Sequence, residues 1–583
     1  MKTELQDLDT DIQKRVRFWL EGNFDEATKR EVQSLLDNDR ESVVDAFYTN
    51  LSFGTGGMRG LMGVGTNRMN KYTVRWATQG LANYLKMAYD PKTPLKVAIG
   101  YDSRHNSRFF AEESARVLAG NDIEVFIFSE IRPTPLVSFA CRFHKCSGAI
   151  MITASHNPPL YNGYKVYWDD GAQVLPPHDT GIMNEVMRLN DPDQVKLASF
   201  TSSLIHHMGK EVDDAYLKAI APLQLWPAMG KKEGESLEIL YSSLHGTGIT
   251  IIPSALMQFG YTNLNFVDDQ IIPDGNFPTA PKPNPEEKAA LKLGIDKLLS
   301  DNLDIFVATD PDCDRFGVVV NHQGQAIALS GNQSLAIACE YVLEAYKESG
   351  RLPAKAACVK TIVSTELFRA IVEGHKAFCF DVLTGFKYIA EKIRLWESSP
   401  NGYNFVFGGE ESYGCLLGSV VRDKDAVIAT CMMAEIALFA KRQKKTLVDL
   451  LDELYMRYGV YTEHIASLEF AETKEGKEGM LDVMRRLREK SPKKLLNYKV
   501  SKVVDLLQAS DLPKSDVLIL ELDDGSKIVI RPSGTEPKTK VYVLCRENGD
   551  KIDKSNLETL KKSANLKAIA LANEIKRLVA QKS

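Results

Sequence analysis

The chain has 583 residues, of which 44% are hydrophobic and 26% charged, and it carries a formal net charge of −5 at pH 7. This composition is typical of a globular protein, and the length predicts about three to five domains, because a single core stops growing at roughly 250–300 residues. The slight acidity excludes a general nucleic-acid binder and a protein that adheres to anionic membranes. The 9 cysteines lack C-x-x-C spacing, which predicts reduced thiols in a cytoplasmic protein and no disulfide framework or zinc site.

The first 45 residues have a polar, helical pattern and carry no recognisable chemistry. They are amphipathic and charged, without the apolar core of a signal peptide. The longest apolar stretch, 426–440, is interrupted by Thr430 and Glu435, which predicts a buried helix and no membrane span.

The middle of the chain repeats one pattern three times: strand, helix, strand, helix, strand. Such an alternation predicts mostly parallel sheets flanked by helices. The predicted strands are 95–100, 123–128 and 148–153, then 237–242, 263–267 and 303–309, and last 357–363, 376–382 and 403–407. The predicted helices are one from about residue 108, a short one before 148, and those near 250–259, 286–299, 365–373 and 385–396.

The C-terminal segment follows a different pattern. Residues 517–522 and 527–530 flank Asp524-Gly525, which is typical of a β-hairpin. A further strand is expected over 539–545 and a long amphipathic helix over 556–581. This pattern predicts a small α+β domain.

Three carboxylates stand at alternate positions in Asp310-Pro-Asp312-Cys-Asp314-Arg315, directly after a predicted buried strand. A pleated strand places alternate side chains on one face, so we expect all three to point to one place. Oxygen donors of this kind suit Mg²⁺ or Ca²⁺. An EF-hand is excluded because Arg315 and Asn321 occupy the positions that require Gly and Glu. The alternative is a solvated acidic loop, but Arg315 beside the acids favours a site where an anion such as phosphate arrives.

A serine ends another predicted strand in Thr153-Ala-Ser155-His156-Asn-Pro. Taken alone it is a nucleophile or a helix cap, and its flanks lack the GxSxG pattern of acyl hydrolases. Tight turns at Asn157-Pro158 and Asn162-Gly163 precede Lys165.

A candidate phosphate loop follows the strand that ends near Ile530. It reads Arg531-Pro-Ser533-Gly534-Thr535-Glu-Pro-Lys538. Glycine frees backbone N–H groups, the hydroxyls add donors, and an arginine can bind two phosphate oxygens at once.

Ser155, Asp310 and Glu410 each follow the third strand of one repeat. Open α/β sheets bind ligands at the carboxyl ends of their strands. Because the three polar motifs occupy the same place in each repeat, we interpret them as functional loops and not as unrelated turns.

These motifs together resemble the α-D-phosphohexomutase family. The similar segments are TASHNP, TDPDCDR, GEESYG at 409–414, RPSGTEPK, and FGTGGMRG at 53–60, in the family's order. Gly56 departs from the Ser or Ala of many members, which bears on specificity more than on reaction type. The sequence RDKD at 422–425 is similar to the phosphoglucomutase branch, and the chain resembles its longer subgroup, which includes bacterial phosphoglucomutases and phosphopentomutase-type enzymes.

The resemblance implies an α/β fold of four domains around a central cleft: three similar β-α-β-α-β mixed-sheet domains and a smaller C-terminal α+β domain that closes over the substrate. The expected boundaries are 1–45 for the helical extension, 46–215 for the serine loop domain, 216–330 for the metal loop domain, 331–460 for the sugar loop domain and 461–583 for the phosphate loop domain.

The resemblance implies a phosphoglucomutase that interconverts glucose 1-phosphate and glucose 6-phosphate through phosphoserine and glucose 1,6-bisphosphate, with Mg²⁺ as cofactor and the bisphosphate as activator. Mannose or pentose phosphates, or synthesis of the bisphosphate, are alternatives within the class. A non-catalytic sugar-phosphate sensor is the alternative from another class. The expected partners are small sugar phosphates, with neither nucleic acid nor membrane, and the sequence carries no signal for the oligomeric state.

The implied metal ligands are Ser155, Asp310, Asp312 and Asp314. There are three candidates for the general acid/base: His156, Lys165, if its pKa is lowered, and Lys424, with a solvated surface lysine as the alternative. We expect His156 to be structural, because adjacent side chains of an extended segment point apart. Arg59, Arg315 and Lys165 are expected around the transferring phosphate. Residues 54–60 lack the GK[ST] ending of a nucleotide P-loop, so ATP is not implied.

The remaining implied contacts are to the substrate. The sugar hydroxyls are expected to be bound by Glu410 and Ser412. The phosphate that is not transferred is expected to be bound by Arg531, Ser533, Gly534, Thr535 and Lys538.

Overall fold

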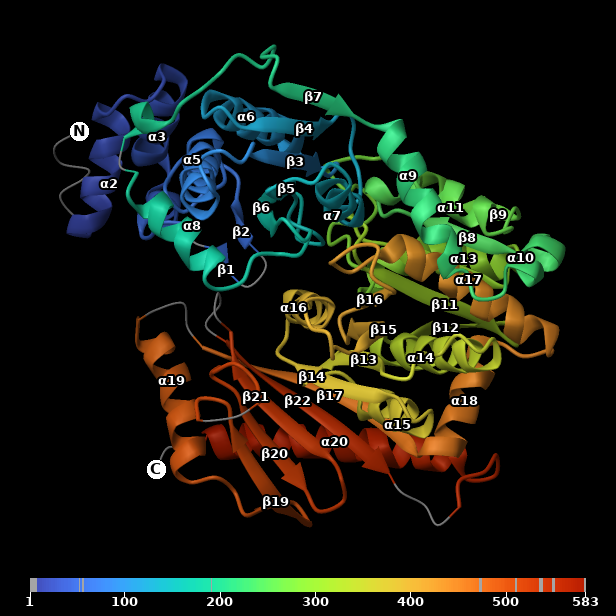
Figure 1. Cartoon of the computed structure of the whole chain (residues 1–583). Helices are drawn as coiled ribbons and strands as arrows, with labels where there is room; N and C mark the ends of the chain where they lie inside the picture. Colours follow the sequence, from blue (N-terminus) through green and yellow to red (C-terminus); the bar gives the residue numbers. More distant parts are fainter. Residues whose placement is uncertain are drawn as a thin grey trace. The chain divides into compact units, whose positions relative to one another are not determined.

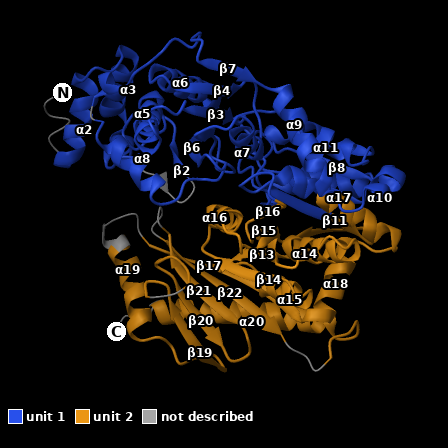
Figure 2. Cartoon of the chain, in the orientation of Figure 1, with its two compact units in different colours: residues 1–319, 419–431 blue, residues 320–418, 432–583 orange. Residues whose placement is uncertain are grey.

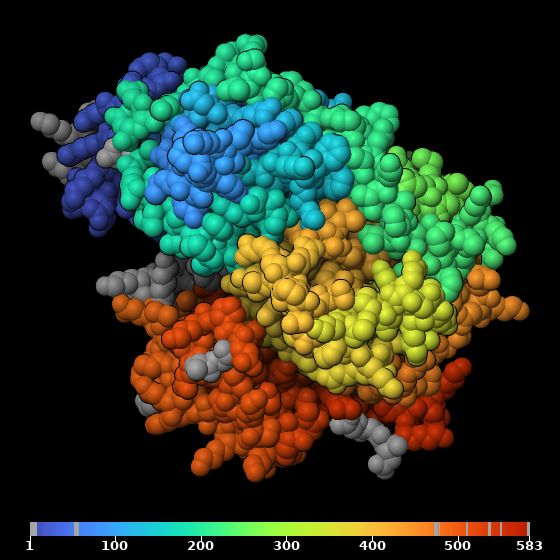
Figure 3. All heavy atoms as spheres, viewed as in Figure 1, coloured from blue at the N-terminus to red at the C-terminus, as the bar shows by residue number. Residues whose placement is uncertain are grey.

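The computed structural model describes residues 8–51, 53–54, 57–189, 191–470, 474–508, 511–533, 538–547 and 551–580. The chain divides into two compact units (Figure 2), which are unit 1, residues 1–319 and 419–431, and unit 2, residues 320–418 and 432–583. Figure 3 shows both with all heavy atoms. Within the described ranges, no helix combines the length and the apolar character needed to cross a membrane.

Three helices begin unit 1, as the polar helical pattern predicts: α2 (Thr10–Glu21), α3 (Glu26–Asn38) and α4 (Arg40–Phe47) (Figure 1). An aspartate caps each one by accepting a backbone N–H of the first turn. Trp19 stacks on Phe24 with ring centroids 4.5 Å apart, and both lie in a separate apolar core that includes Val64 and Tyr72. The extension therefore packs on the segment that follows Arg59.

A seven-stranded sheet forms the main part of unit 1. Its order is β1-β2-β6-β5-β3-β4-β7, and the strands are β1 (Phe53–Gly54), β2 (Gly57–Leu61), β3 (Lys96–Tyr101), β4 (Glu124–Phe128), β5 (Gly148–Ile152), β6 (Tyr161–Trp168) and β7 (Ile205–Met208). The accompanying helices are α5 (Lys71–Ala88), α6 (Ser107–Gly120), α7 (Thr134–Phe143) and α8 (His178–Met187).

Alternation along the strands separates the two faces of this sheet. Tyr164, Val166 and Trp168 of β6 join the apolar core with α5 and α6. Lys165 and Tyr167 therefore lie on the opposite face. On that face α7 packs close, since a Cβ on Gly100 of β3 would stand 2.3 Å from Val137.

The second sheet has the order β12-β11-β10-β8-β9, and its central strands run parallel. The strands are β8 (Ile239–Ser242), β9 (Leu264–Phe266), β10 (Ile305–Thr309), β11 (Phe316–His322) and β12 (Gln325–Leu329), and the chain enters unit 2 within β11. The helices are α9 (Lys210–Ile220), α10 (Pro227–Glu233), α11 (Ile252–Gln258), α12 (Asp268–Ile271) and α13 (Lys288–Ser300).

The third sheet, in unit 2, has the order β14-β13-β15-β16. Its strands are β13 (Ala356–Thr361), β14 (Phe378–Val382), β15 (Asn404–Glu410) and β16 (Gly414–Leu417). The helices are α14 (Gly331–Glu348), α15 (Glu366–Gly374), α16 (Phe386–Glu397), α17 (Ala426–Arg442) and α18 (Leu447–Tyr458). As in the first sheet, the strand after the motif loop returns antiparallel, so each of these two loops is a reversal between neighbouring strands.

The C-terminal sheet is antiparallel, in the order β17-β22-β21-β20-β19-β18. Its strands are β17 (Val460–Glu469), β18 (Lys494–Leu495), β19 (Tyr498–Asp505), β20 (Leu518–Leu522), β21 (Lys527–Pro532) and β22 (Lys538–Glu547), with α19 (Lys474–Glu489) and α20 (Leu557–Ala580). Gly525 has φ +85° in the predicted hairpin turn, a conformation that glycine adopts without strain.

This architecture confirms the predicted fold class: three α/β domains with mixed sheets and a C-terminal α+β domain. The two sheets of unit 2 share an apolar cluster, in which Ile362 and Leu383 meet Val529 and Tyr542. The predicted four-domain boundaries and the closing motion stay predictions.

Candidate active site

The three aspartates of the acidic motif converge in the loop between β10 and β11. Asp310, Asp312 and Asp314 are buried, and one carboxylate oxygen of each lies within 4.8 Å of the others. The three side chains point to one place, as expected, but the pleated geometry does not produce this, because these residues follow the strand and form a turn in which Cys313 has φ 53°. A compact turn thus brings together side chains that an extended strand would space apart. The alternative of a solvated acidic loop is also wrong.

Hydrogen bonds orient the carboxylates, but two of the carboxylate oxygens accept no hydrogen bond. Asp310 Oδ1 accepts the backbone N–H groups of Asp314 (3.1 Å) and Arg315 (3.0 Å). Asp312 Oδ2 accepts from Thr134 Oγ1 (2.8 Å) and Lys165 Nζ (2.7 Å). The Oδ1 atoms of Asp312 and Asp314 are buried and have no hydrogen-bond partner among the described residues. Buried carboxylate oxygens that lack a hydrogen-bond donor, in an all-oxygen set, fit a hard divalent cation.

The three carboxylates differ in their affinity for protons. Burial and the neighbouring charges of Asp312 and Asp314 raise the pKa of Asp310 well above its usual value. Burial also raises the pKa of Asp312, but the charge of Lys165 and the hydrogen bonds with Lys165, Asp310 and Thr134 together outweigh burial, and the net pKa is lowered. Asp314 has a lowered pKa as well, because Lys165, Lys424 and Arg315 together exceed the effects of burial and of Asp312. The cluster therefore holds negative charge that the adjoining cations partly balance.

Ser155 lies against this cluster. Its hydroxyl donates to Asp310 Oδ2 at 2.7 Å, across 155 positions of sequence. The loop after β5 turns directly into β6 and no helix follows Ser155, so the helix-cap alternative is wrong. The serine loop and the acidic loop thus form one site within unit 1.

His156 is closer to the serine than expected. The backbone of Ser155 is left-handed, with φ 52°, so the segment is not extended and the two side chains turn toward each other. His156 Nδ1 lies 3.2 Å from Ser155 Oγ. Burial, followed by the charges of Arg315 and Arg59, lowers the pKa of His156 to about 2, which keeps the ring neutral. Because the Ser155 hydroxyl donates its proton to Asp310, a neutral imidazole that carries its hydrogen on Nδ1 can donate to the serine oxygen.

Lys165 is buried on β6, opposite Met151 of β5. Its ammonium bonds Asp312 Oδ2 (2.7 Å) and Asp314 Oδ2 (3.1 Å). Burial lowers the pKa of Lys165, but these two carboxylates outweigh burial and raise it overall. A lysine acts as a base only if its pKa is lowered. The surroundings of Lys165 raise its pKa, so this residue does not meet that condition.

Lys424 belongs to unit 1, although its sequence position follows the sugar loop. Its Nζ lies 3.3 Å from Asp314 Oδ2 and 3.2 Å from Asp423 Oδ1. Asp423 Oδ2 in turn accepts from Tyr167 OH and Gln173 Nε2, both at 3.0 Å. The lysine is buried, so the alternative of a solvated surface charge is wrong.

Two arginines add positive charge. Arg59 donates to Asn157 Oδ1 at 3.2 Å, and burial lowers its pKa although Asp312 opposes that shift. Arg315 Nη1 donates to Glu286 Oε1 at 3.3 Å, and its Nε lies 3.7 Å from Asp314 Oδ1. Cations beside a carboxylate cluster are suited to binding an anion such as phosphate.

The sugar loop and the phosphate loop both lie in unit 2. Glu410 ends β15, and its Oε1 accepts the N–H of Gly385 at 2.8 Å. Ser412 is half-buried in the following turn, where Tyr413 has φ 64°.

Arg531 and Ser533 lie at the end of β21, and the backbone bond from Ser533 N to Lys538 O (2.7 Å) closes the phosphate loop. Gly534 and Thr535 are outside the described residues. Burial and the charge of Glu411 raise the pKa of Tyr542 to about 12, while a hydrogen bond with Arg531 lowers it. The stem of the phosphate loop is therefore close to the sugar loop within unit 2.

Sequence reasoning missed the residues that support these loops. Thr134 holds Asp312, while Asp102 and Arg104 hold the serine loop. The segment Gly100-Tyr-Asp-Ser-Arg104 also follows a strand of the first repeat, so the same topological signal was present there. Thr134 follows a proline at the start of α7 and has no comparable signal.

Family models described as phosphoglucomutase/phosphomannomutase, alpha/beta/alpha domains I, II and III, match residues 50–192, 214–324 and 330–458. A phosphoglucomutase of Staphylococcus epidermidis is 35% identical over 532 residues, covering 86% of this chain and 94% of the relative. One from Staphylococcus aureus strain MSSA476 is 33% identical over 555 residues, covering 92% and 97%.

Solved structures agree at the level of the fold. A phosphoglucomutase from Paramecium, the phosphoprotein pp63/parafusin in an open form, superposes with a TM-score of 0.68 at 15% identity, covering 91% of this chain and 96% of that one. A Thermus thermophilus protein described as a phosphomannomutase gives 0.67 at 21% identity, covering 91% and 100%. With family models over more than half of the sequence and relatives at this identity, the chain belongs to the phosphoglucomutase/phosphomannomutase family, the α-D-phosphohexomutases, and is a mutase of the isomerase class.

Proposed function

We propose that the chain is a phosphoglucomutase that interconverts glucose 1-phosphate and glucose 6-phosphate, with Ser155 as the phosphoryl carrier. The observation that supports it most is the 2.7 Å hydrogen bond from Ser155 Oγ to Asp310 Oδ2, which places a nucleophilic hydroxyl on the carboxylate cluster. The names of the relatives support the choice of glucose.

Asp310, Asp312 and Asp314, with an oxygen of the modified Ser155, would hold Mg²⁺. When bound, it neutralises charge on the phosphoryl oxygens during transfer. The chain's own cations complete that role: Lys165 keeps its charge because Asp312 and Asp314 raise its pKa. Arg59 and Arg315 are proposed to bind phosphoryl oxygens through charge-assisted hydrogen bonds.

In the first transfer the Oγ–P bond of phosphoserine breaks as a sugar hydroxyl oxygen bonds to phosphorus. The sugar hydroxyl gives its proton to a base, and Ser155 Oγ, the leaving group, takes up a proton. In the second transfer Ser155 Oγ loses that proton as it bonds to the other phosphorus of the bisphosphate, and the sugar oxygen that is released regains a proton. Lys424 is the candidate for holding the proton, because the ring of His156 stays neutral. The variant K424Q should therefore shift the pH profile of kcat, and H156Q should not.

Unit 2 supplies the recognition of the substrate in this proposal. Glu410 and Ser412 bind sugar hydroxyls, and Arg531 with Ser533, Gly534, Thr535 and Lys538 binds the phosphate that is not transferred. Bound glucose 1,6-bisphosphate, which phosphorylates the serine, accounts for activation.

The test is an intact-mass measurement with peptide mapping of the purified protein, coupled to turnover assays on glucose, mannose and pentose phosphates. We expect an added phosphoryl group on Ser155 and the highest kcat/KM for glucose 1-phosphate. A higher kcat/KM for another sugar assigns that substrate instead. Net formation of glucose 1,6-bisphosphate indicates a synthase, and no turnover of any substrate with an unmodified serine contradicts the mutase proposal.

A further inference from the structure

The backbone of the proposed carrier, Ser155, is held in an unusual conformation. Its φ of 52° lies in the left-handed region, which residues with a Cβ adopt rarely. Such a conformation persists only where the surrounding structure enforces it, and it recurs at functional sites. In this chain it turns the hydroxyl toward Asp310.

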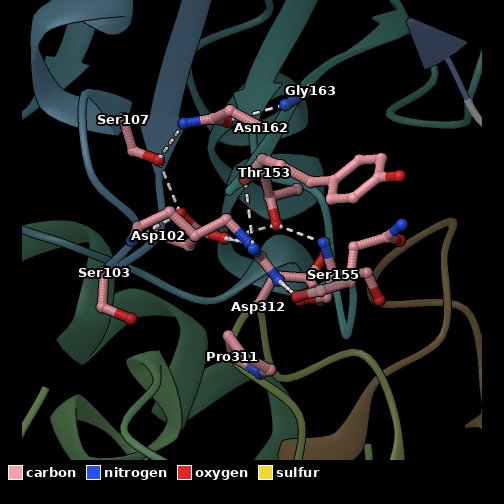
Figure 4. A network of polar contacts seen from close by, with 12 residues as sticks. Asp102, Ser103, Ser107, Thr153, Ser155, Asn162, Gly163, Pro311 and Asp312 are labelled. Carbon is pink, nitrogen blue, oxygen red and sulfur yellow. Dashed lines mark hydrogen bonds and ion pairs between the residues drawn. The ribbon is translucent and has the colours of Figure 1, made fainter. Parts of the chain in front are cut away.

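The amide side of Ser155 is fixed by a threonine two residues before it. The N–H of Ser155 donates to Thr153 Oγ1 at 2.8 Å. The same hydroxyl donates to Asp102 Oδ2 at 2.6 Å, so its proton is committed and its lone pair faces the serine amide. Figure 4 shows this chain of contacts from Asp102 through Thr153 to Ser155.

The carbonyl side of Ser155 is fixed by an arginine from another loop. Arg104 Nη2 donates to the carbonyl of Ser155 at 2.6 Å, and Nη1 donates to the carbonyls of Pro158 (2.9 Å) and Tyr161 (3.1 Å). The guanidinium lies over the ring of Phe277, 4.9 Å from its centroid. One planar cation thus ties together the whole turn from the serine to β6.

Asp102 connects the two sides. Its Oδ2 accepts from Thr153 and lies 3.3 Å from Arg104 Nε, and the Asp102 and Arg104 side chains are both fully buried. Its Oδ1 accepts from Ser107 Oγ (2.7 Å) and from the N–H of Arg104 (3.0 Å). A single carboxylate therefore orders both groups that clamp the peptide units of Ser155.

We propose that Asp102, Thr153 and Arg104 are positioning residues for the phosphoryl transfer, which hold Ser155 left-handed so that Oγ stays aligned with Asp310. This inference rests on the proposed function of Ser155. None of the three side chains needs to touch the substrate. Their effect is to orient the carrier before the reaction, and a misplacement of about 1 Å costs on the order of 100-fold in rate.

The test compares Thr153→Val, which keeps the shape and removes the hydroxyl, with Thr153→Ser, which keeps the hydroxyl. The matched control is Thr78→Val, since Thr78 is also buried in unit 1 and donates to the carbonyl of Val74. Each protein is measured for Tm, for kcat and KM with glucose 1-phosphate, and for the rate at which glucose 1,6-bisphosphate phosphorylates Ser155.

We expect Thr153→Val to lower kcat and the phosphorylation rate by about 100-fold with little change in KM. Thr153→Ser should restore most of that loss, and Thr78→Val should lower Tm without this change in kcat. A kcat in Thr153→Val within a few-fold of wild type, or an equal loss in Thr78→Val, overturns the proposal.

If Thr153→Val does not fold, Arg104→Lys serves as the second variant. It keeps one cation near Asp102 but cannot span the four carbonyls that Arg104 binds, those of Ser155, Asn157, Pro158 and Tyr161. We therefore expect kcat to fall again with KM unchanged, and a wild-type kcat overturns the proposal. These outcomes are read against active wild type. An inactive wild type with unmodified Ser155 contradicts the proposed function itself, so the two failures are distinguishable.

Discussion

The candidate catalytic residues of unit 1 and the candidate binding residues of unit 2 are held in different ways. In unit 1, Ser155 and the three aspartates are buried, and side chains from separate segments bond them directly. In unit 2, Arg531, Ser533 and Ser412 are half-buried, and their loops are anchored mainly by backbone pairing at the stems. Glu410 is the exception in unit 2, since it is buried and accepts the N–H of Gly385. The candidate catalytic side chains are therefore fixed by contacts from distant segments to a greater extent than most of the candidate binding side chains.

The buried lysines of the two units pair with different kinds of carboxylate. In unit 1, Lys165 and Lys424 balance the carboxylates of the reactive site. In unit 2, the buried Lys360 pairs with Glu366 (2.9 Å) and Asp381 (3.0 Å), and Lys527 of the C-terminal sheet reaches the same Glu366 at 2.6 Å. These ion pairs of unit 2 connect two sheets. None of them includes a residue of the sugar loop or of the phosphate loop.

The largest expected effect is that of Ser155→Ala. Removing the proposed carrier should lower kcat on the order of 10⁴-fold or more, while Tm changes little because the side chain contributes few packing contacts. Steady-state turnover and differential scanning fluorimetry measure the two quantities. Ser243→Ala, which removes another buried loop hydroxyl of unit 1, is the control. Near wild-type turnover in Ser155→Ala rejects the phosphoserine mechanism.

The next effect concerns the carboxylate cluster. Asp312→Asn keeps the shape of the side chain but removes one charge, so we expect Mg²⁺ affinity to weaken on the order of 100-fold. Isothermal titration with Mg²⁺ measures this without turnover, and excess EDTA should inhibit the wild type. Because all the donors are oxygens, Mg²⁺ should restore activity better than Zn²⁺. Undiminished turnover in EDTA contradicts the metal site.

A smaller effect is expected from the loops of unit 2. Arg531→Ala removes a charge-assisted contact and should cost about 1.5–3 kcal/mol, or tens to a few hundredfold in kcat/KM. The loss should be the same for every sugar phosphate, because a phosphate contact ignores the sugar.

Glu410→Gln is the matched variant for the sugar loop. It should change the ratio of kcat/KM between glucose and mannose or pentose phosphates, because Glu410 is proposed to read hydroxyl positions. A strong change of this ratio in Arg531→Ala but not in Glu410→Gln means that the roles of the two loops are exchanged.

The smallest effect is on stability and depends on pH. Burial raises the pKa of Glu463, on β17, to about 7, against an ordinary value of 4.5. The folded state therefore binds this proton more tightly, and the stabilisation is full below about pH 4.5 and lost as pH rises through 7. Tm of Glu463→Gln minus that of wild type should increase over this range. Glu348→Gln, at an exposed position, is the control. If the Tm difference between Glu463→Gln and wild type stays constant with pH, the raised pKa of Glu463 is contradicted.

Local sequence determined the elements and the position of each motif. Apolar runs predicted strands such as β10 and β15, and polar turns predicted where those strands end. Since sheets of this kind bind ligands at their strand ends, Ser155, Asp310 and Glu410 could be found without any coordinates. The Asp-Gly pair likewise predicted the hairpin of β20 and β21.

Only the tertiary structure decided which of these residues come into contact, which protonation state they have and which backbone conformation they adopt. Asp310 and Ser155 are 155 positions apart, and only the packing of two sheets in unit 1 puts their oxygens at 2.7 Å. The return of residues 419–431 to unit 1 gives Lys424 its contact with Asp314, although the sequence places it after the sugar loop. Long-range packing and neighbouring charges also explain three further properties. These are the neutral ring of His156, the raised pKa of Lys165 and the left-handed backbone of Ser155. Burial and neighbouring charge set protonation and strain, and both depend on long-range contacts that a local pattern does not encode.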